Sequence, residues 1–203
     1  RIGEKIGSAT HVQFHAARTY EDFVIGLFPK PTSEGLAFEV RQGDLLRANN
    51  IAKDKEHVLV IDEINRADLA RVLGEAIVLF ESGESARSVC LPHALDGYNG
   101  EFTLSPNLFV LGTRNTADNS IARMDIAIRR RFAFIEMWPV LDVVEKEGVD
   151  LAKRIFSDVI HTFAEMTDED TLRLVPGHAY FLDPRPDLEK TDRPMRVAHR
   201  IEY

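Results

Sequence analysis

Val58-Leu-Val-Ile-Asp62-Glu63-Ile-Asn-Arg66 is the stretch that decides the fold of this chain. Its four leading residues are apolar and mostly β-branched, which predicts a short strand buried on both faces, as in a parallel sheet. Two adjacent carboxylates follow the strand directly, at the edge of an α/β sheet where ligands bind. The stretch therefore predicts an α/β protein with a candidate site at Asp62 and Glu63, although two solvated acids at a strand end would show the same pattern.

Three further apolar runs predict strands, so that with the run at 57–61 the chain has four predicted strands. Apolar residues recur at three- and four-residue steps from Leu69 to Phe80, which predicts a helix between the second and third strands. The other predicted elements are strands at 11–14, 107–111 and 132–137, helices at 120–130 and 141–167 with a break at Gly148, a hairpin or long loop at 84–104, and a loop at 183–194. We therefore predict an α/β core over residues 1–139 and a smaller helical part over residues 140–203.

The composition describes a folded, acidic domain. The chain has 203 residues, of which 44% are hydrophobic, and its formal net charge is −8. These values argue against a disordered chain and against a basic nucleic-acid coat. No apolar run approaches the roughly 18–20 residues that span a bilayer, so no membrane association is expected. The lone Cys90 cannot form an internal disulfide and the histidines lack metal-ligand spacing, which favours a cytoplasmic protein without structural zinc.

The adjacent acids at 62 and 63 match a pair of acids that have separate roles in nucleotide hydrolases. The first acid would hold Mg²⁺, usually through water, and the second would orient or deprotonate the attacking water. The apolar run 107–111 leads into Gly112-Thr113-Arg114-Asn115-Thr116-Ala117-Asp118. An amide such as Asn115 at the end of an adjacent strand would hydrogen-bond this water and the terminal phosphate. The alternative is a turn in which Asn115 and Asp118 cap the next helix.

Three consecutive arginines, Arg129-Arg130-Arg131, end the helix predicted at 120–130. Such a cluster, running straight into a predicted buried strand, is unusual for a solvated surface. One of the arginines would reach a phosphate bound by a neighbouring subunit and stabilise charge in the transition state. The alternative is a favourable interaction of positive charge with a helix C-terminus, which we expect of one of them.

The order of these features resembles the AAA+ NTPases: strand–DEINR, amphipathic helix, hairpin, strand–GTxNTAD, helix–RRRF. Within them the chain is most similar to the McrB clade, the GTP-hydrolysing motors of modification-dependent restriction systems. Further matches are Val12-Gln-Phe-His15 with Tyr20-Glu-Asp-Phe-Val24 upstream, and Pro176-Gly-His-Ala-Tyr-Phe181 downstream. The resemblance covers nearly the whole chain and implies the three-layer α/β core of a P-loop NTPase, followed by a small helical lid.

The resemblance implies a role for each matching residue. Asp62 would be the magnesium-side acid, Glu63 the catalytic glutamate, and Asn115 the sensor that positions water. Arg130 and Arg131 are both candidates for the arginine finger, and the sequence does not choose between them. These five residues form the predicted hydrolytic site.

Two more residues, Arg66 and Asp118, are expected on the nucleotide-binding side. Arg66 follows the acids and would contact nucleotide or a neighbouring subunit, and Asp118 closes the Asn-Thr-Ala-Asp run. That run is similar to the guanine-reading motif of GTPases, but its place at a strand end favours sensing of phosphate. The chain departs from the family where Arg114 replaces a Met and Asn119 an Arg. The resemblance implies Mg²⁺ as cofactor, with the substrate open between GTP and ATP.

No Gly-x-x-x-x-Gly-Lys-[Ser/Thr] phosphate loop occurs in the sequence. The nearest stretch, Gly3-Glu-Lys-Ile-Gly-Ser8, has these residue types in the wrong order. In the family, the P-loop and its strand precede the segment that begins here, and this chain starts at Arg1, not Met. We therefore expect a fragment that begins after the P-loop, lacks the first strand of the core and is inactive alone.

The resemblance implies a ring-forming motor, a hexamer in the family, that hydrolyses nucleotide between subunits and powers DNA translocation. A separate nuclease of McrC type would be its partner, and the whole complex would contact DNA. Two alternatives stay open: a MoxR-like, ATP-driven chaperone that remodels proteins, and a degenerate module that only scaffolds a complex. Intact Asp62, Glu63 and Asn115, together with the arginines, argue against the scaffold.

Overall fold

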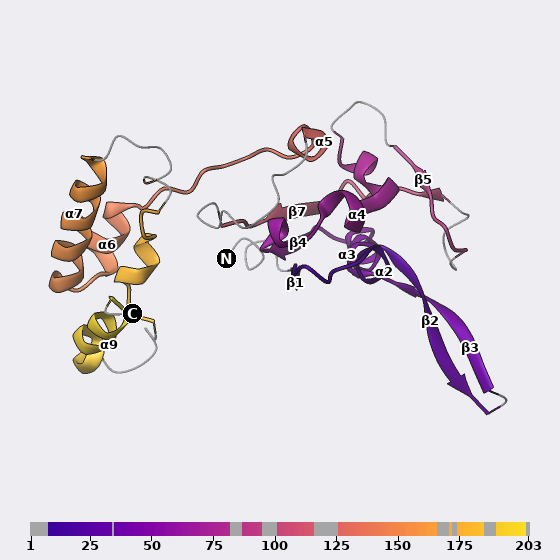
Figure 1. Cartoon of the computed structure of the whole chain (residues 1–203), viewed down its shortest axis with the longest axis horizontal. Helices are drawn as coiled ribbons and strands as arrows, with labels where there is room; N and C mark the ends of the chain where they lie inside the picture. Colours follow the sequence, from indigo (N-terminus) through magenta and orange to yellow (C-terminus); the bar gives the residue numbers. More distant parts are fainter. Residues whose placement is uncertain are drawn as a thin grey trace. The chain divides into compact units, whose positions relative to one another are not determined.

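A computed structural model of the chain describes residues 8–33, 35–81, 87–94, 101–115, 126–165, 171, 174–184 and 190–201. The chain divides into two compact units, Arg1–Ala133 and Phe134–Tyr203 (Figure 1). The first unit contains a parallel sheet with helices, and the described part of the second is helical. Each unit has its own apolar core.

A three-stranded parallel sheet forms the centre of the first unit, in the order β1 (Ala9–Gln13), β4 (His57–Asp62), β7 (Leu108–Gly112). The middle strand is the predicted apolar run. Its successive residues Val58 and Leu59 point to opposite faces of the sheet and are 1% and 0% exposed. A strand buried on both faces is typical of parallel sheets covered by helices, so the predicted α/β class is confirmed.

The register of the sheet brings the ends of β4 and β7 together. Ile61 pairs with Gly112 in β7, and on the other side of β4 Asp62 pairs with Gln13 in β1. Asp62 is the last paired residue of β4 and is exposed. The two acids therefore leave the sheet at its carboxyl edge, where the sequence predicts them.

Short helices and two antiparallel hairpins complete the first unit. Their bounds are α2 (Tyr20–Phe23), β2 (Ile25–Thr32), β3 (Gly35–Gln42), α3 (Asp44–Ala52), the 3₁₀ helix η1 (Ile64–Arg66), α4 (Leu69–Leu73), the 3₁₀ helix η2 (Gly74–Phe80), β5 (Val89–Cys90), β6 (Glu101–Phe102) and α5 (Ile126–Arg129). β2 pairs with β3, and β5 pairs with β6. The second pairing shows that the predicted feature at 84–104 is a hairpin, whereas the β2–β3 hairpin was not predicted.

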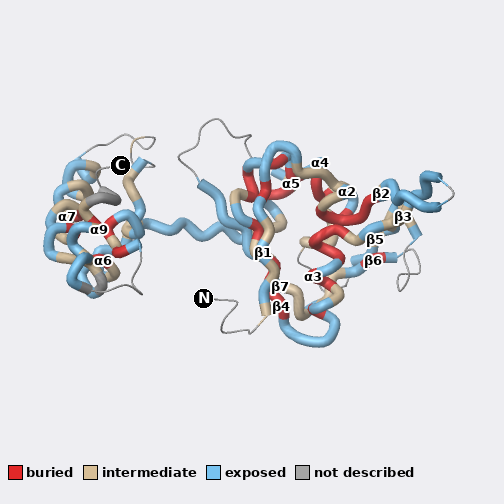
Figure 2. The backbone as a smooth tube through the Cα atoms, turned by 90° about the horizontal axis from the view of Figure 1, so that it is seen from below, coloured by how far each residue is buried: buried red, intermediate tan, exposed pale blue. Residues whose placement is uncertain are grey.

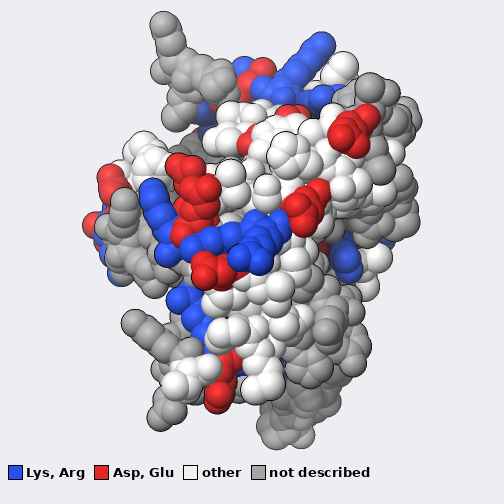
Figure 3. All heavy atoms as spheres, turned by 90° about the vertical axis from the view of Figure 1, so that its left-hand side faces the viewer, with Lys and Arg blue, Asp and Glu red and all other residues white. Residues whose placement is uncertain are grey.

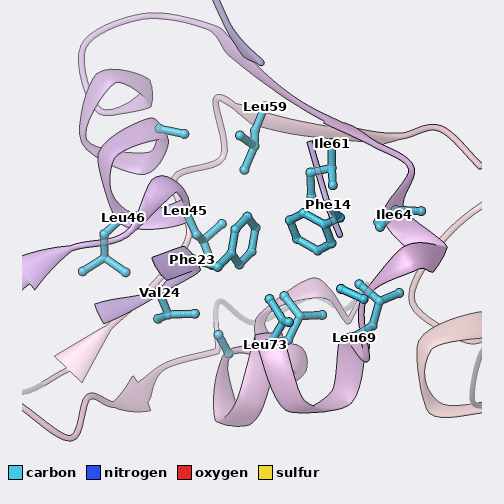
Figure 4. Close-up of a cluster of buried hydrophobic side chains, with 14 of the residues drawn as sticks. Phe14, Phe23, Val24, Leu45, Leu46, Leu59, Ile61, Ile64, Leu69 and Leu73 are labelled. Atoms are coloured by element: carbon cyan, nitrogen blue, oxygen red, sulfur yellow. The ribbon is translucent and has the colours of Figure 1, made fainter. Parts of the chain in front are cut away.

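One apolar cluster joins the sheet to the helices of the first unit (Figure 4). The rings of Phe14 and Phe23 meet edge to face, with their centroids 5.1 Å apart. Leu45 of α3 and Leu69 of α4 enter the same cluster, and in Figure 2 the buried parts of the tube include α2, α3 and α4. Burying a side chain of this size contributes about 1.5–3 kcal/mol. The cluster therefore holds the helices against β4.

The helix that the sequence predicts over Leu69–Phe80 is divided into two elements at Gly74. α4 ends at Leu73, and the chain continues as η2 from Gly74, whose φ is 51°. A side chain at Gly74 would press on the ring of Tyr20, whose hydroxyl donates to Glu75 Oε1 at 2.5 Å. Burial and this carboxylate raise the pKa of Tyr20 above its ordinary value. The prediction of one continuous α-helix is therefore wrong, because the backbone at Gly74 leaves the α-helical conformation.

The second unit is a small helical assembly. Its described elements are α6 (Leu141–Glu147), α7 (Asp150–Ala164), η3 (His178–Phe181), η4 (Lys190–Asp192) and α9 (Arg193–Ile201). The break predicted at Gly148 is confirmed between α6 and α7. Phe156 and Phe181 meet edge to face at 4.9 Å in its core. Buried Asp183 accepts from Arg196 Nε at 3.0 Å and from Nη2 at 2.6 Å, a bidentate pair that ties α9 to the chain after η3.

The strand predicted at 132–137 does not form. Residues 132–140 contain neither helix nor strand, and Ile135 and Met137 are 81% and 82% exposed. A buried strand needs a neighbour for its backbone hydrogen bonds. Among the described residues, β7 is an edge strand that pairs with β4 alone. The prediction is wrong because an apolar run indicates a tendency to be buried but does not provide a neighbouring strand for its backbone hydrogen bonds.

Two other predictions are met in part by the described residues. The helix predicted at 120–130 is described from Ile126 onward, and its expected start lies outside the described residues. The loop predicted at 183–194 is too long, because α9 begins at Arg193 with Pro194 in its first turn. Proline is compatible with a first helical turn, where a backbone N–H has no intrahelical partner.

Charged side chains of both signs share the surface. On the face drawn in Figure 3, Lys and Arg lie next to Asp and Glu, so the acidic excess forms no broad patch among the described residues seen there. Within the described part of the chain, no helix combines the length and the apolar character that crossing a membrane requires.

His57 is buried at the start of β4, at the opposite end of the strand from the acids. Its ring is 1% exposed. Nδ1 and Ser8 Oγ are hydrogen-bonded at 2.7 Å, and Nε2 and Thr10 Oγ1 at 2.9 Å. Burial, with a smaller contribution from the charge of Lys55, lowers the pKa of His57. The folded protein therefore favours the neutral imidazole.

His57 makes stability depend on pH in a defined direction. Because its pKa is lower in the folded state, the unfolded chain binds more protons below the ordinary histidine pKa of about 6.5. The free energy of unfolding should fall as the pH drops from 7.5 to 5.5, and His57→Asn should flatten this dependence. Urea unfolding at several pH values measures it. Equal slopes for the wild type and the variant would contradict the assignment.

Gly43, between β3 and α3, is required by a close approach of two backbones. Its N–H donates to the Val24 carbonyl at 2.7 Å, and a Cβ at Gly43 would lie 2.2 Å from the carbonyl carbon of Phe23. Gly43→Ala should lower the free energy of unfolding by about 3 kcal/mol or more, because backbone cannot give way as a flexible side chain does. Gly177→Ala is the matched control, since nothing lies within 4 Å of its Cβ position. Chemical denaturation compares the two, and similar losses would refute the steric argument.

Candidate functional site

Asp62 and Glu63 leave β4 with different backbone conformations. Asp62 ends the extended strand, whereas Glu63 takes a left-handed conformation with φ 53° and ψ 44°. Glu63 is the only non-glycine residue with positive φ in the described part of the chain. Such a conformation costs on the order of 1–3 kcal/mol and persists only where surrounding contacts enforce it. The turn directs the chain from the strand straight into η1.

Thr113, just after the end of β7, supplies the contacts that hold this turn. Its hydroxyl donates to Asp62 Oδ1 and accepts from the Glu63 N–H at 3.3 Å. Its own N–H donates to the Ile61 carbonyl at 2.9 Å, and its carbonyl accepts from the Ile64 N–H at 2.9 Å. One residue therefore bonds to four consecutive residues of the turn.

Asn115 lies two residues beyond Thr113 at the same edge of the sheet. The side chain of Asn65, which is 9% exposed, donates from Nδ2 to the Asn115 carbonyl at 3.3 Å. The structure thus brings the predicted sensor next to the turn that carries Asp62 and Glu63.

Arg66 faces Glu63 from the end of η1. Arg66 Nε lies 3.2 Å from Glu63 Oε2, and the two side chains are 49% and 23% exposed. An ion pair this accessible to water contributes about 0–1 kcal/mol. The pair therefore holds the Glu63 side chain only weakly, and breaking it requires little free energy.

The donor set at this edge suits magnesium. Mg²⁺ keeps several waters and takes one or two carboxylates together with substrate phosphates. Asp62 is exposed and has Oδ1 engaged by Thr113, which leaves Oδ2 for a metal-bound water. No group of three or more His, Cys, Asp or Glu side chains within the described ranges could hold a metal by itself. The arrangement therefore fits an ion that arrives with a phosphate.

Arg131, after the end of α5, is held by contacts within its own chain. Its side chain is 16% exposed. Nη1 donates to the Ala127 carbonyl at 2.7 Å, and Nη2 lies 3.3 Å from Glu81 Oε2. The same Glu81 oxygen lies 2.8 Å from Arg87 Nη1, ahead of β5. Glu81 therefore joins the chain after η2, the β5–β6 hairpin and the end of α5.

Arg130 has different surroundings, since it is exposed on the surface of this unit. In the described part of the chain, neither Arg130 nor Arg131 contacts Asp62 or Glu63. The contacts described for Arg131 are instead with Glu81 and the Ala127 carbonyl. Asp118, the remaining predicted site residue, lies outside the described residues.

Thr113 and Glu81 are the residues that sequence reasoning missed. The signal for Thr113 is a hydroxyl directly after one strand, placed to face acids that follow the neighbouring strand. Glu81 gives no comparable signal, because it lies 50 positions from Arg131 in sequence and meets it only in the folded protein.

Comparisons with known proteins relate this site to a family. The family model described as AAA domain (dynein-related subfamily) matches residues 4–132. The EcoKMcrB subunit of a type IV methyl-directed restriction enzyme from Escherichia coli strain K12 is 33% identical over 172 residues, which are 82% of this chain and 37% of that protein. A component of the type II restriction enzyme BsuMI from Bacillus subtilis strain 168 is 34% identical over 87 residues, which are 38% of this chain and 25% of that protein.

This chain therefore spans well under half the length of the curated relatives it matches. Among solved structures, a proposed ATPase from Cytophaga hutchinsonii aligns with 62% of this chain and 32% of its own chain, at 17% identity and a TM-score of 0.40. That similarity is too low to bear on the fold.

Proposed function

This chain belongs to the AAA family, in its dynein-related subfamily and its McrB-like clade, and from this premise we propose that it hydrolyses a nucleoside triphosphate as part of a restriction motor. One observation carries the proposal: Asp62 and Glu63 end a buried parallel strand and are bonded to the end of the neighbouring strand, which leads to Asn115. Hydrolysis needs this combination of a metal-side acid, a base and a polar group for water and phosphate.

Each of the site residues at the carboxyl edge of the sheet has a role in the proposed reaction. Asp62 would hold Mg²⁺ through water, and the ion, when bound, would neutralise charge on the phosphates. Glu63 leaves Arg66, orients the attacking water and takes its proton. Asn115 positions that water against the terminal phosphate, with Arg66 and Asp118 on the nucleotide side. The substrate is GTP or ATP.

The arginines act from a second subunit. Within the described part of one chain no contact joins the arginines to the acids, which favours hydrolysis at the interface of a ring that we propose to be a hexamer. Arg130 is the better placed finger, because it is exposed, whereas Arg131 would first have to leave Glu81 and the Ala127 carbonyl. A finger of this kind stabilises charge on the transferring phosphoryl group.

The setting of the motor follows from its relatives. Both are named as parts of restriction enzymes, which favours restriction over a protein-remodelling chaperone. We propose that residues 1–139 form the hydrolytic core and residues 140–203 its lid, that the ring translocates DNA in the cytoplasm, and that a nuclease of McrC type is its partner.

Glu63→Gln tests the assignment of the base. In the complete protein, turnover of GTP and ATP should fall at least about 100-fold, because an amide cannot take the proton. Nucleotide binding, measured with a fluorescent analogue, should persist. Glu56→Gln is the matched control, since Glu56 is exposed just ahead of β4, at the opposite end of the strand. Near-normal hydrolysis by Glu63→Gln would remove this residue from the mechanism.

Mixed rings test the arginine finger. Arg130→Ala and Glu63→Gln should each abolish hydrolysis alone. Mixing them should restore part of it, because some interfaces then pair an intact Glu63 with an intact Arg130 from the neighbour. Arg129→Ala, at the exposed neighbouring position that ends α5, is the control and should stay active. Absence of rescue contradicts action in trans, and rescue by Arg131→Ala instead would move the role to that residue.

A further inference from the structure

We propose that Thr113 is a positioning residue of the hydrolytic site, fixing the Asp62 carboxylate and the left-handed backbone of Glu63 at the same time. The effect of Thr113 on hydrolysis rests on the proposed function. The contact itself stands on geometry, because the Thr113 hydroxyl donates to Asp62 Oδ1 and accepts from the Glu63 N–H.

The hydroxyl suits this double role. A threonine hydroxyl has one hydrogen to donate and lone pairs to accept with. Here the hydrogen goes to the acid and a lone pair receives the N–H of the next residue. Valine has the same shape without either function, and serine keeps both functions without the methyl group. The two substitutions therefore separate the hydroxyl from packing.

Fixing the acid matters for the metal. With Oδ1 bonded to Thr113, the carboxylate cannot rotate freely, and Oδ2 points in one direction for a metal-bound water. Outer-shell partners of this kind orient ligands and typically affect metal affinity or activity by about 10–100-fold. Thr113 would thus act on hydrolysis without touching nucleotide or metal.

Fixing the backbone matters for the base. Glu63 has φ 53°, a conformation that a residue with a side chain adopts only under constraint. The Thr113 hydroxyl and carbonyl bond to the N–H groups of Glu63 and Ile64, on either side of this strained position. Without the hydroxyl, the backbone at Glu63 can relax and its carboxylate moves away from the attacking water.

The first experiment measures hydrolysis in the complete protein. Thr113→Val should lower kcat and raise the Mg²⁺ concentration that gives the half-maximal rate, and the two effects combined should amount to about 10–100-fold. Nucleotide affinity measured in the presence of EDTA should stay unchanged. Thr113→Ser should restore most of the activity. Thr10→Val is the control, because it removes a threonine hydroxyl of the same sheet whose bond goes to His57, at the opposite end of β4 from the acids. Normal kcat and Mg²⁺ dependence in an active Thr113→Val protein would overturn the inference.

The second experiment needs no hydrolysis. Glu63→Gly should raise the Tm of the protein by about 2–4 °C, because glycine takes positive φ without strain. In a Thr113→Val background, the same substitution should raise Tm less, because the backbone there has already left the strained conformation. Equal gains in both backgrounds would overturn the positioning role. Absence of hydrolysis in the wild type contradicts the proposed function, and this Tm comparison still decides the role of Thr113.

Discussion

The parallel pairing of β4 with β7 is the constraint on which the rest of this structure depends. Since β4 is buried on both faces, a shift of register by one residue would turn each of its side chains to the other face, so the pairing of Ile61 with Gly112 is strongly fixed. That register sets Asp62 and Glu63 opposite Thr113. The geometry of the candidate site is thus a consequence of the packing of the core around β4.

The core around β4 keeps this register in place. Phe14, at the end of β1, and Phe23 of α2 pack edge to face under the sheet, and α3 and α4 contribute leucines to the same cluster. Gly43 lets the backbone before α3 approach that of Phe23. The stability of the sheet and the precision of the site therefore have one physical origin, the close packing of helices on one buried strand.

Sequence reasoning succeeded where one local pattern dictates one structure. The apolar runs at β4 and β7, the hairpin after η2, and the break at Gly148 each follow from neighbouring residues. It failed at 132–137, where burial depends on a strand neighbour, and at Gly74, whose positive φ interrupts the predicted helix. It also missed the β2–β3 hairpin, although Leu36, Phe38 and Val40 recur at every second position, the spacing of a strand. In the folded protein Leu36 and Phe38 are 65% and 61% exposed.

The sequence by itself determined the α/β class, the family, and the presence of two acids, an amide and an arginine cluster in a defined order. Each is encoded by residue type and spacing along the chain. Only the tertiary structure decided that Glu63 is left-handed, that Thr113 bonds to both acids, and that Glu81 holds Arg131 while Arg130 stays exposed. The physical reason is that these contacts join residues about fifty positions apart, whose partners are chosen by packing and register instead of by local sequence.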